Sequence, residues 1–180
     1  MHQDRTYAGV LPATIDDQGV RHFLLGRERV SDAFGDFGGG VESGETIVAA
    51  AARECHEESM GMLGTQDEIR AQIIHHTVKT ADMVGFRGSV FMVHIPFDTN
   101  INVYFNRVVK YLGRCQIQCP DGYLEKSEMR WFSEHELMDM YRRGPSSADL
   151  KFRPNILHNI VKQFIQGTSI HEVALGSDRG

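Results

Sequence analysis

The sequence predicts an α/β or α+β sandwich, because strand-like and helix-like segments are mixed along the chain. Its 180 residues suit one domain with a sizeable core. We see no internal repeat and no low-complexity block, and the 41% hydrophobic and 24% charged content is ordinary for a globular protein in water. We therefore expect a single domain over residues 1–167, with a C-terminal helix at about 154–166 and a flexible tail over 168–180.

The first half of the chain begins with strand-like segments and then turns helical. Residues 7–15 and 21–28 are typical of two strands joined by the turn-like DDQG. Residues 32–40 mix aromatics with glycine and predict a short strand that enters a loop. The segment from Thr46 to Ser59 is alanine-rich and has no internal Gly or Pro, which predicts a helix.

The second half continues this mixture of elements. Strand-like runs cover residues 72–80, 87–95 and 128–132, and helical apolar spacing covers residues 103–113. Ser133 is expected to cap a further helix, with Glu136 in the capping-box position. Pro154 and Gly167 bracket the last predicted helix.

Charge and cysteine content narrow the function classes. The net charge of −5 argues against a broad nucleic-acid surface, because neutralising phosphates requires a surplus of Lys and Arg. The spacing of Cys55, Cys115 and Cys119 suits neither a disulfide framework nor a zinc site, so reduced thiols are expected. The N-terminus lacks the blocks of a signal peptide, and no apolar run approaches the ~20 residues of a membrane helix. We expect a cytoplasmic protein without a membrane partner.

The helix predicted at 46–59 carries an unusual set of carboxylates. Steps of three and four residues relate Glu54, Glu57 and Glu58, which places them on one side, away from the small side chains of Val48, Ala52, Cys55 and Ser59. Two carboxylates about 4 Å apart repel by up to ~4 kcal/mol at an effective dielectric of 20. Arg53 projects roughly 100° from Glu54, so a divalent cation is the expected partner of the carboxylates. The alternative is an ordinary solvated face.

The frame around these glutamates favours a functional site. It reads Gly39, five residues, Glu45, seven residues, Arg53-Glu54, Cys55, one residue, Glu57-Glu58. Six fixed residue types in one register have odds on the order of 10⁻⁷ per starting point at average composition. The segment resembles the box of the Nudix hydrolase family, GX5EX7REUXEEXGU, over residues 39–61.

The resemblance departs from the box at one position, where Met60 replaces a glycine. Gly61 follows directly, and it would still end the helix if the helix were one residue longer. Cys55 replaces a bulky aliphatic residue, a mild change because a buried cysteine acts as a small hydrophobe.

The resemblance implies an αβα sandwich of Nudix type with a mixed sheet, and a box that holds Mg²⁺ or Mn²⁺. It implies metal ligands from Glu54, Glu57, Glu58 and the carbonyl of Gly38. In the same way, Arg53 would orient the glutamates, Glu45 would hold the loop, and one of the glutamates, with Glu54 and Glu57 as our candidates, would act as the base that activates water. The family often adds a carboxylate from a later loop, for which the candidates are Glu125 and Glu128.

The activity that the resemblance implies is hydrolysis of a diphosphate linkage in a nucleoside diphosphate joined to another group. Candidate substrates are a nucleotide, a nucleotide sugar or a dinucleoside polyphosphate. Arg27 and Arg29, which follow the second strand, are candidates for phosphate binding, and surface charges are the equally weighted alternative. Two other functions stay open, a nucleotide-binding or regulatory module without turnover and a hydrolase of capped RNA. The sequence is also compatible with a homodimer.

Overall fold

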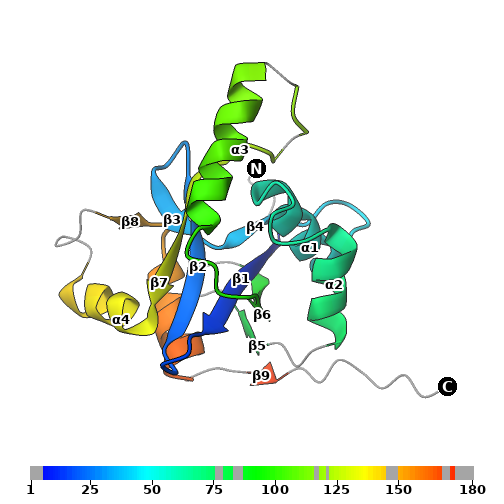
Figure 1. The fold of residues 1–180 in the computed structure, drawn as a ribbon. Helices are drawn as coiled ribbons and strands as arrows, with labels where there is room; N and C mark the ends of the chain where they lie inside the picture. The colour runs from blue at the N-terminus through cyan, green and yellow to red at the C-terminus, as the bar shows by residue number, and fades with distance from the viewer. Residues whose placement is uncertain are drawn as a thin grey trace.

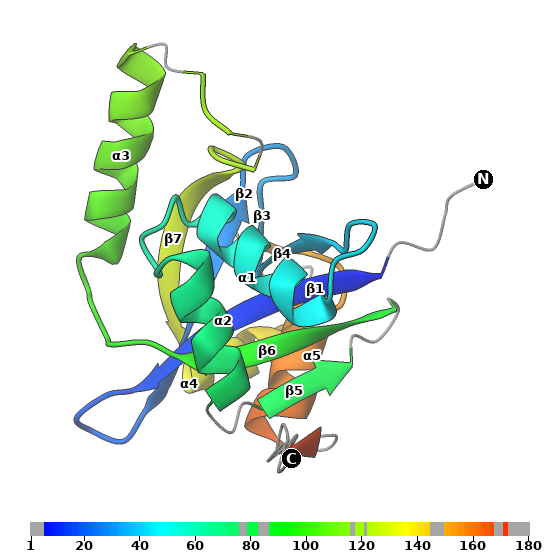
Figure 2. The ribbon, with the colours of Figure 1, turned by 90° about the vertical axis from the view of Figure 1, so that its right-hand side faces the viewer.

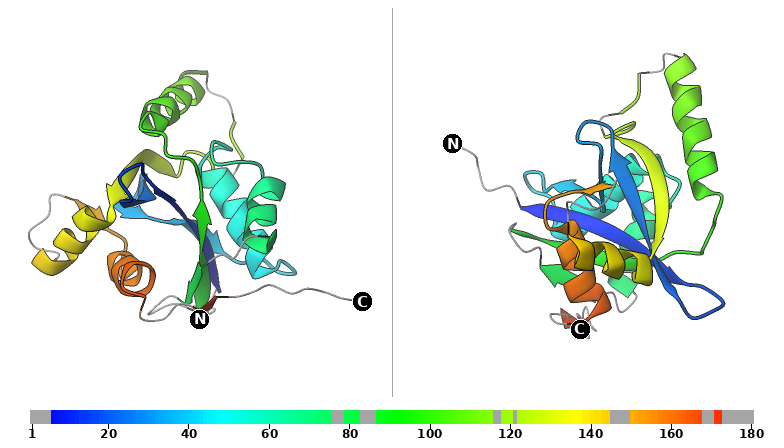
Figure 3. Two further views of the ribbon diagram at one scale, coloured as in Figure 1. Left: turned by 60° about the horizontal axis from the view of Figure 1, so that its bottom comes forward. Right: turned by 90° about the vertical axis from the view of Figure 1, so that its left-hand side faces the viewer.

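The computed structural model describes residues 6–75, 79–82, 87–115, 118–120, 122–144, 150–167 and 171–172. Over these residues, helices cover both faces of a mixed sheet, which Figure 1 and the left view of Figure 3 show. The predicted sandwich is therefore confirmed.

The sheet is built from nine strands in the described part of the chain. They are β1 (Tyr7–Ile15), β2 (Arg21–Glu28), β3 (Ala33–Gly35), β4 (Phe37–Gly40), β5 (Lys79–Asp82), β6 (Gly88–His94), β7 (Lys126–Ser133), β8 (Lys151–Phe152) and β9 (His171–Glu172). Their order is β8-β3-β2-β1-β6-β5-β9, while β4 pairs with β1 and β7 pairs with β2. The pairs β1–β6 and β3–β8 are parallel and the others are antiparallel.

The helices lie in two layers with one exception. They are α1 (Ile47–Glu58), α2 (Gln66–His75), α3 (Ile101–Cys115), α4 (Glu134–Arg143) and α5 (Ile156–Asn159), which continues as a π-helix over Ile160–Ile165. Helices α1 and α2 cover one face, and α4 and α5 cover the other (Figure 3). Helix α3 extends beyond the sheet beside β7, as Figure 2 shows.

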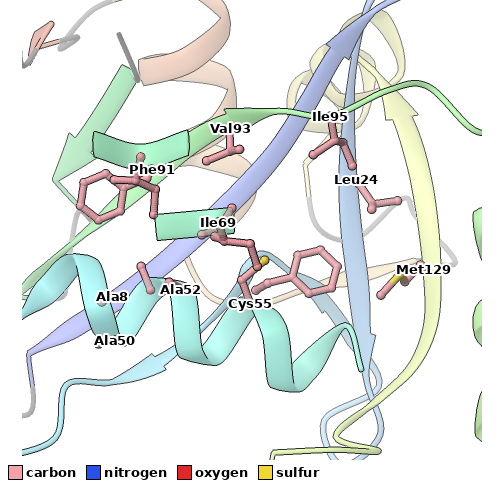
Figure 4. Close-up of a cluster of buried hydrophobic side chains, with 14 of the residues drawn as sticks. Ala8, Leu24, Ala50, Ala52, Cys55, Ile69, Phe91, Val93, Ile95 and Met129 are labelled. Atoms are coloured by element: carbon pink, nitrogen blue, oxygen red, sulfur yellow. The ribbon is translucent and has the colours of Figure 1, made fainter. Parts of the chain in front are cut away.

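Alternation along the strands divides the core between the two faces of the sheet. Leu24 faces α1 and α2, whereas its neighbours Phe23 and Leu25 face α4 and α5. Ala52 and Cys55 of α1 are fully buried against the first of these faces (Figure 4). Small side chains let the helix approach the sheet closely, and this approach brings the helix to the glycines of β4.

Two sequence-based predictions differ from the structure, one in its element type and one in its bounds. Residues 72–75 continue helix α2, which buries Ile69 and Ile73 one turn apart. Of the strand expected at 72–80, Lys79 and Thr80 lie in β5, and residues 76–78 lie outside the described residues. The helix expected to begin at Pro154 begins at Ile156 and changes to π-type hydrogen bonding at Ile160. Of the expected tail, His171 and Glu172 pair with β5, and residues 168–170 and 173–180 lie outside the described residues.

None of the helices in the described residues is both long and apolar enough to cross a membrane. The N-terminal segment used in the signal-peptide argument lies partly outside the described residues, since residues 1–5 are not described.

Candidate active site

Helix α1 carries the site and begins where the sequence predicts. The Thr46 hydroxyl oxygen accepts a hydrogen bond from the Ala49 N–H at 3.1 Å, which satisfies one of the helix's first N–H groups. The helix ends at Glu58, so it does not extend by the one residue that would have let Gly61 end it. Met60 itself takes the left-handed conformation, with φ of 53°, and Gly61 follows with φ of 74°.

Glycines of β4 lie directly against the carboxylates of α1. The Gly38 N–H donates to Oε2 of Glu58 at 2.8 Å. A Cβ atom added to Gly39 would lie 2.5 Å from Oε1 of Glu54, so any side chain there would displace that carboxylate. The box glycines therefore let the helix and the strand meet without intervening side chains.

Arg53 is the centre of the carboxylate cluster. Its Nε and Nη2 each lie 3.0 Å from an oxygen of Glu45, which makes a two-pronged ion pair. Its Nη1 donates to Glu54 at 2.9 Å and to Glu57 at 3.2 Å, and Nη2 also donates to the carbonyl of Gly40 at 3.2 Å. Arg53 contacts the glutamates, as the resemblance implies, although it projects roughly 100° from Glu54 around the helix. Its long side chain reaches back across the 100° step.

The electrostatics of the cluster differ from one carboxyl to the next. The Arg53 hydrogen bond lowers the pKa of Glu45. Burial raises the pKa of Glu54 and of Glu57, and Arg53 opposes both shifts. Repulsion from Glu57 and Glu125 adds to the rise in the pKa of Glu54. Raised carboxyl pKa values suit a group that takes up a proton near neutral pH.

Glu58 does not share the exposed side of the helix, contrary to the prediction. Only 4% of its surface is exposed, and its Oε1 lies 3.1 Å from Nζ of Lys126 on β7. Burial raises the pKa of Glu58 to about 8, and the Lys126 charge opposes this shift. A helical wheel describes the helix alone and does not include the strand packed against it. Because Gly38 and Gly39 have no side chains, β4 leaves room for a carboxylate on the packed side of the helix.

The two candidates for an additional carboxylate are placed differently. Glu125 acts on the pKa of Glu54, which places its charge near the cluster. Glu128 pairs across the sheet with Arg27, with Oε2 3.1 Å from the arginine Nε. The structure therefore brings Glu125, and not Glu128, toward the box glutamates.

The two candidate phosphate-binding arginines already have partners. Arg27 also pairs with Asp32 at 3.2 Å and lies over the Phe34 ring. Arg29 donates from Nε to the carbonyl of Leu124 at 2.9 Å, and its side chain holds the segment that leads to β7. Their role toward a substrate stays a prediction.

Two buried residues of the site were missed in the sequence. Lys126 is fully buried, and Asp36 immediately precedes β4. Tyr7 donates to Oδ1 of Asp36 at 2.9 Å, while Oδ2 has no hydrogen-bond partner in the described part of the chain. Burial raises the pKa of Asp36. A lysine beside two glutamates looks like a surface charge in a sequence, and only the pairing of β7 with β2 shows that it points inward.

The donor chemistry fits a hard divalent cation. The carboxylates of Glu54 and Glu58, one turn apart on α1, lie against the backbone of β4, and Mg²⁺ and Mn²⁺ prefer such oxygens. As the side chains stand, no group of three or more His, Cys, Asp or Glu residues within the described segments is arranged around one point. The carboxylates form ion pairs with Arg53 and Lys126 instead. A bound cation therefore has to share or replace these ion pairs.

Comparisons with known proteins identify the family of the chain. A family model described as the NUDIX domain matches residues 5–152. No curated protein matches the chain significantly. Among solved structures, a bifunctional NMN adenylyltransferase/ADP ribose pyrophosphatase from Francisella tularensis, complexed with AMP and a Mn ion, is 15% identical with a TM-score of 0.53, and the match covers 92% of this chain and 42% of that one. At this identity the likeness shows the fold alone.

Two further solved structures are more distant in shape. An Ap4A hydrolase from C. elegans is 17% identical with a TM-score of 0.48, and the match covers 90% of this chain and 99% of that one. The Nudix hydrolase RenU from M. smegmatis is 13% identical with a TM-score of 0.47, covering 92% and 90%. The domain match spans most of the chain and includes the whole carboxylate cluster. The chain therefore belongs to the Nudix family.

Proposed function

We propose that the protein is a metal-dependent hydrolase of a diphosphate linkage in a nucleoside diphosphate joined to another group. The observation that carries the proposal is the convergence of Glu54 and Glu57 on one nitrogen of Arg53, beside the glycines of β4. An acidic site of this kind cannot hold a phosphoanhydride unaided, because both carry negative charge. A divalent cation would reverse the local charge, polarise a phosphoryl oxygen and lower the pKa of bound water.

In this proposal the box residues have separate tasks. Glu54, Glu57, Glu58 and the Gly38 carbonyl would hold Mg²⁺ or Mn²⁺, with Glu125 as the added carboxylate. Arg53 keeps the glutamate side chains in place through its contacts, and Glu45 fixes Arg53. Glu54 or Glu57 would take the proton from the attacking water, since burial raises the pKa of each toward the working range.

A cavity of small-molecule size lies on the α4 and α5 face of the sheet, opposite to α1. Its volume is about 680 Å³, within the range of small-molecule sites, and its lining includes Tyr141, Phe152 and Arg153. Arg153 also reaches toward β4, with Nη1 3.5 Å from Oδ1 of Asp36. The sheet separates this cavity from the carboxylates of α1, so a nucleotide, a nucleotide sugar and a dinucleoside polyphosphate are proposed as substrates from the box alone.

The first experiment is an activity panel with a matched active-site variant. The panel contains nucleoside triphosphates, nucleotide sugars, ADP-ribose, dinucleoside polyphosphates and capped RNA, each with Mg²⁺ or Mn²⁺ and with EDTA. We expect metal-dependent cleavage of at least one diphosphate, and a loss of about 10²-fold or more in kcat for Glu57→Gln if this carboxylate acts as the base. The proposal would be contradicted if EDTA left the activity of the wild type unchanged. It would also be contradicted if the double variant Glu54→Gln/Glu57→Gln were as active as the wild type.

A binding module without turnover is the second candidate. The observation that favours it is the internal neutralisation of the carboxylates by Arg53 and Lys126, which leaves no ready-made set of three converging ligands among the described residues. Thermal stabilisation by members of the same panel without any cleavage would favour this function. We further propose a cytoplasmic location and a domain that extends over residues 1–167.

A further inference from the structure

Lys126 is a fully buried cation beside Glu58 of the proposed metal site. Its aliphatic part passes beneath Gly26, where an added Cβ would lie 2.9 Å from the lysine Cδ. Its Nζ donates to the carbonyl of Asp36 at 3.2 Å and lies 5.9 Å from the centre of the Phe37 ring. A buried ammonium of this kind needs a carboxylate partner, because desolvation of an unpaired charge is costly.

That partner is Glu58, and the contact occupies one of its two oxygens. Oε1 lies 3.1 Å from the Lys126 ammonium, and Oε2 accepts the Gly38 N–H at 2.8 Å. A cation that uses Glu58 as a ligand therefore has to displace or share the lysine at Oε1. The next carboxylate within reach of the ammonium is Glu28, whose Oε1 is 3.8 Å away and also pairs with Arg153 at 3.1 Å.

The charges of the box residues agree with such an exchange. Glu45, Glu54, Glu57 and Glu58 contribute four negative charges when ionised, and Arg53 and Lys126 contribute two positive ones. These six groups keep two negative charges and Glu125 adds a third, so the site retains a net negative charge that favours a divalent cation. The lysine thus offsets part of the carboxylate repulsion when no metal is bound.

We propose that Lys126 competes with the divalent cation for Glu58 and thereby sets the metal affinity of the site. Lys126 acts through Glu58 and is a positioning residue. The inference rests on the proposed metal-dependent function. It adds a residue outside the box, more than 60 positions after it, that tunes how tightly the box binds metal.

The test is a measurement of Mn²⁺ affinity. Binding is detected from the electron paramagnetic resonance signal of free Mn²⁺ and, independently, by calorimetry. The proteins are the wild type, Lys126→Met, Glu58→Gln and the double variant, with Lys110→Met on the exposed side of α3 as the matched control. We expect Lys126→Met to bind Mn²⁺ roughly tenfold more tightly than the wild type, which corresponds to about 1.4 kcal/mol. The gain should vanish in the double variant, and Lys110→Met should match the wild type.

Thermal unfolding keeps the test informative if Lys126→Met is unstable without metal. Competition predicts that Mn²⁺ raises the Tm of Lys126→Met more than that of the wild type, because the metal replaces the lost partner of Glu58. Lys126→Gln, which retains a donor toward the Asp36 carbonyl, provides a milder variant with the same expectation. A purely structural lysine would lower the Tm equally with and without Mn²⁺.

The outcomes separate this inference from the proposed function. If the wild type binds Mn²⁺, and Lys126→Met and Lys126→Gln bind it equally or more weakly, the proposed role of Lys126 is overturned. The metal-dependent site itself then stands. Binding that appears only after Lys126 is replaced supports the competition. The absence of Mn²⁺ binding in the wild type and in all Lys126 variants overturns both proposals.

Discussion

At the residue scale, Arg53 explains how the box tolerates its carboxylates. One guanidinium contacts Glu45, Glu54 and Glu57 and also the Gly40 carbonyl, so loop, helix and strand share one cation. The planar fork of arginine suits this task, because its nitrogens address several oxygens in fixed directions. Lysine would bring a single donor centre to the same place.

Arg53→Lys is therefore expected to be a severe change despite the retained charge. We expect the free energy of unfolding to fall by about 1–3 kcal/mol, because hydrogen bonds to charged groups are lost, and kcat to fall by roughly tenfold or more as Glu54 and Glu57 lose their orientation. Urea denaturation and steady-state kinetics provide the two measurements.

The matched control for this variant is Arg143→Lys, which alters the exposed pair with Asp139 on α4. A surface pair of this kind contributes about 0–1 kcal/mol, so its replacement should leave stability and kcat nearly unchanged. If Arg53→Lys changes stability and kcat as little as Arg143→Lys does, Arg53 does not orient the glutamates.

At the element scale, the approach of α1 to β4 depends on a glycine. Gly39 has no room for a Cβ beside the Glu54 carboxylate, since the two would lie 2.5 Å apart. We expect Gly39→Ala to move that carboxylate and to lower kcat by roughly tenfold or more, with an overpacking cost of about 1–3 kcal/mol in the free energy of unfolding. Kinetics with Mg²⁺ and chemical denaturation test both effects.

Gly113→Ala in α3 is the matched control, because an added Cβ there meets no atom within 4 Å. It should raise the free energy of unfolding by about 0.5–1 kcal/mol through helix propensity and leave kcat unchanged. Wild-type kinetics in Gly39→Ala would show that the close approach of helix and strand is not needed.

The elements also show where local sequence was sufficient for prediction. Helix α1 was predicted within one residue at each end because cap, alanine content and absence of breakers agree. Helix α2 was missed although its signal is present, since Thr65 and Glu68 form a reciprocal capping box at 2.8 and 3.2 Å. The β-branched residues within 72–80 favour a strand, and this preference outweighed the capping signal at Thr65 and Glu68.

At the scale of the whole molecule, the site joins segments that no local pattern relates. The box supplies the carboxylates, whereas Lys126 and Glu125 reach them because β7 pairs with β2, and Arg153 reaches Asp36 from the segment before α5. The Nudix resemblance was therefore sufficient to locate the box, but not the distant residues that reach it. Their positions depend on strand pairing across more than 60 residues, which one sequence does not reveal.

The buried carboxyls predict how the metal-free molecule responds to pH. Burial raises the pKa of Asp36, and it raises that of Glu58 from 4.5 to about 8. The folded state therefore retains protons that the unfolded chain releases, so the Glu58 contribution to stability is fully present below pH 4.5 and is lost as pH rises toward 8. In EDTA, this one group should lower the free energy of unfolding by up to ~1.4 kcal/mol per pH unit within that window.

Glu58→Gln removes the titrating group and should flatten this part of the pH profile, while the exposed Asp67→Asn on α2 should leave it unchanged. The measurement is urea denaturation of the three proteins in EDTA at intervals from pH 4.5 to 8. Parallel profiles for the wild type and Glu58→Gln would mean that Glu58 is already ionised throughout this range, so that the Lys126 charge outweighs burial. A steeper profile in the wild type would mean that burial dominates, and that closing α1 onto β4 raises the proton affinity of this carboxyl in the metal-free molecule.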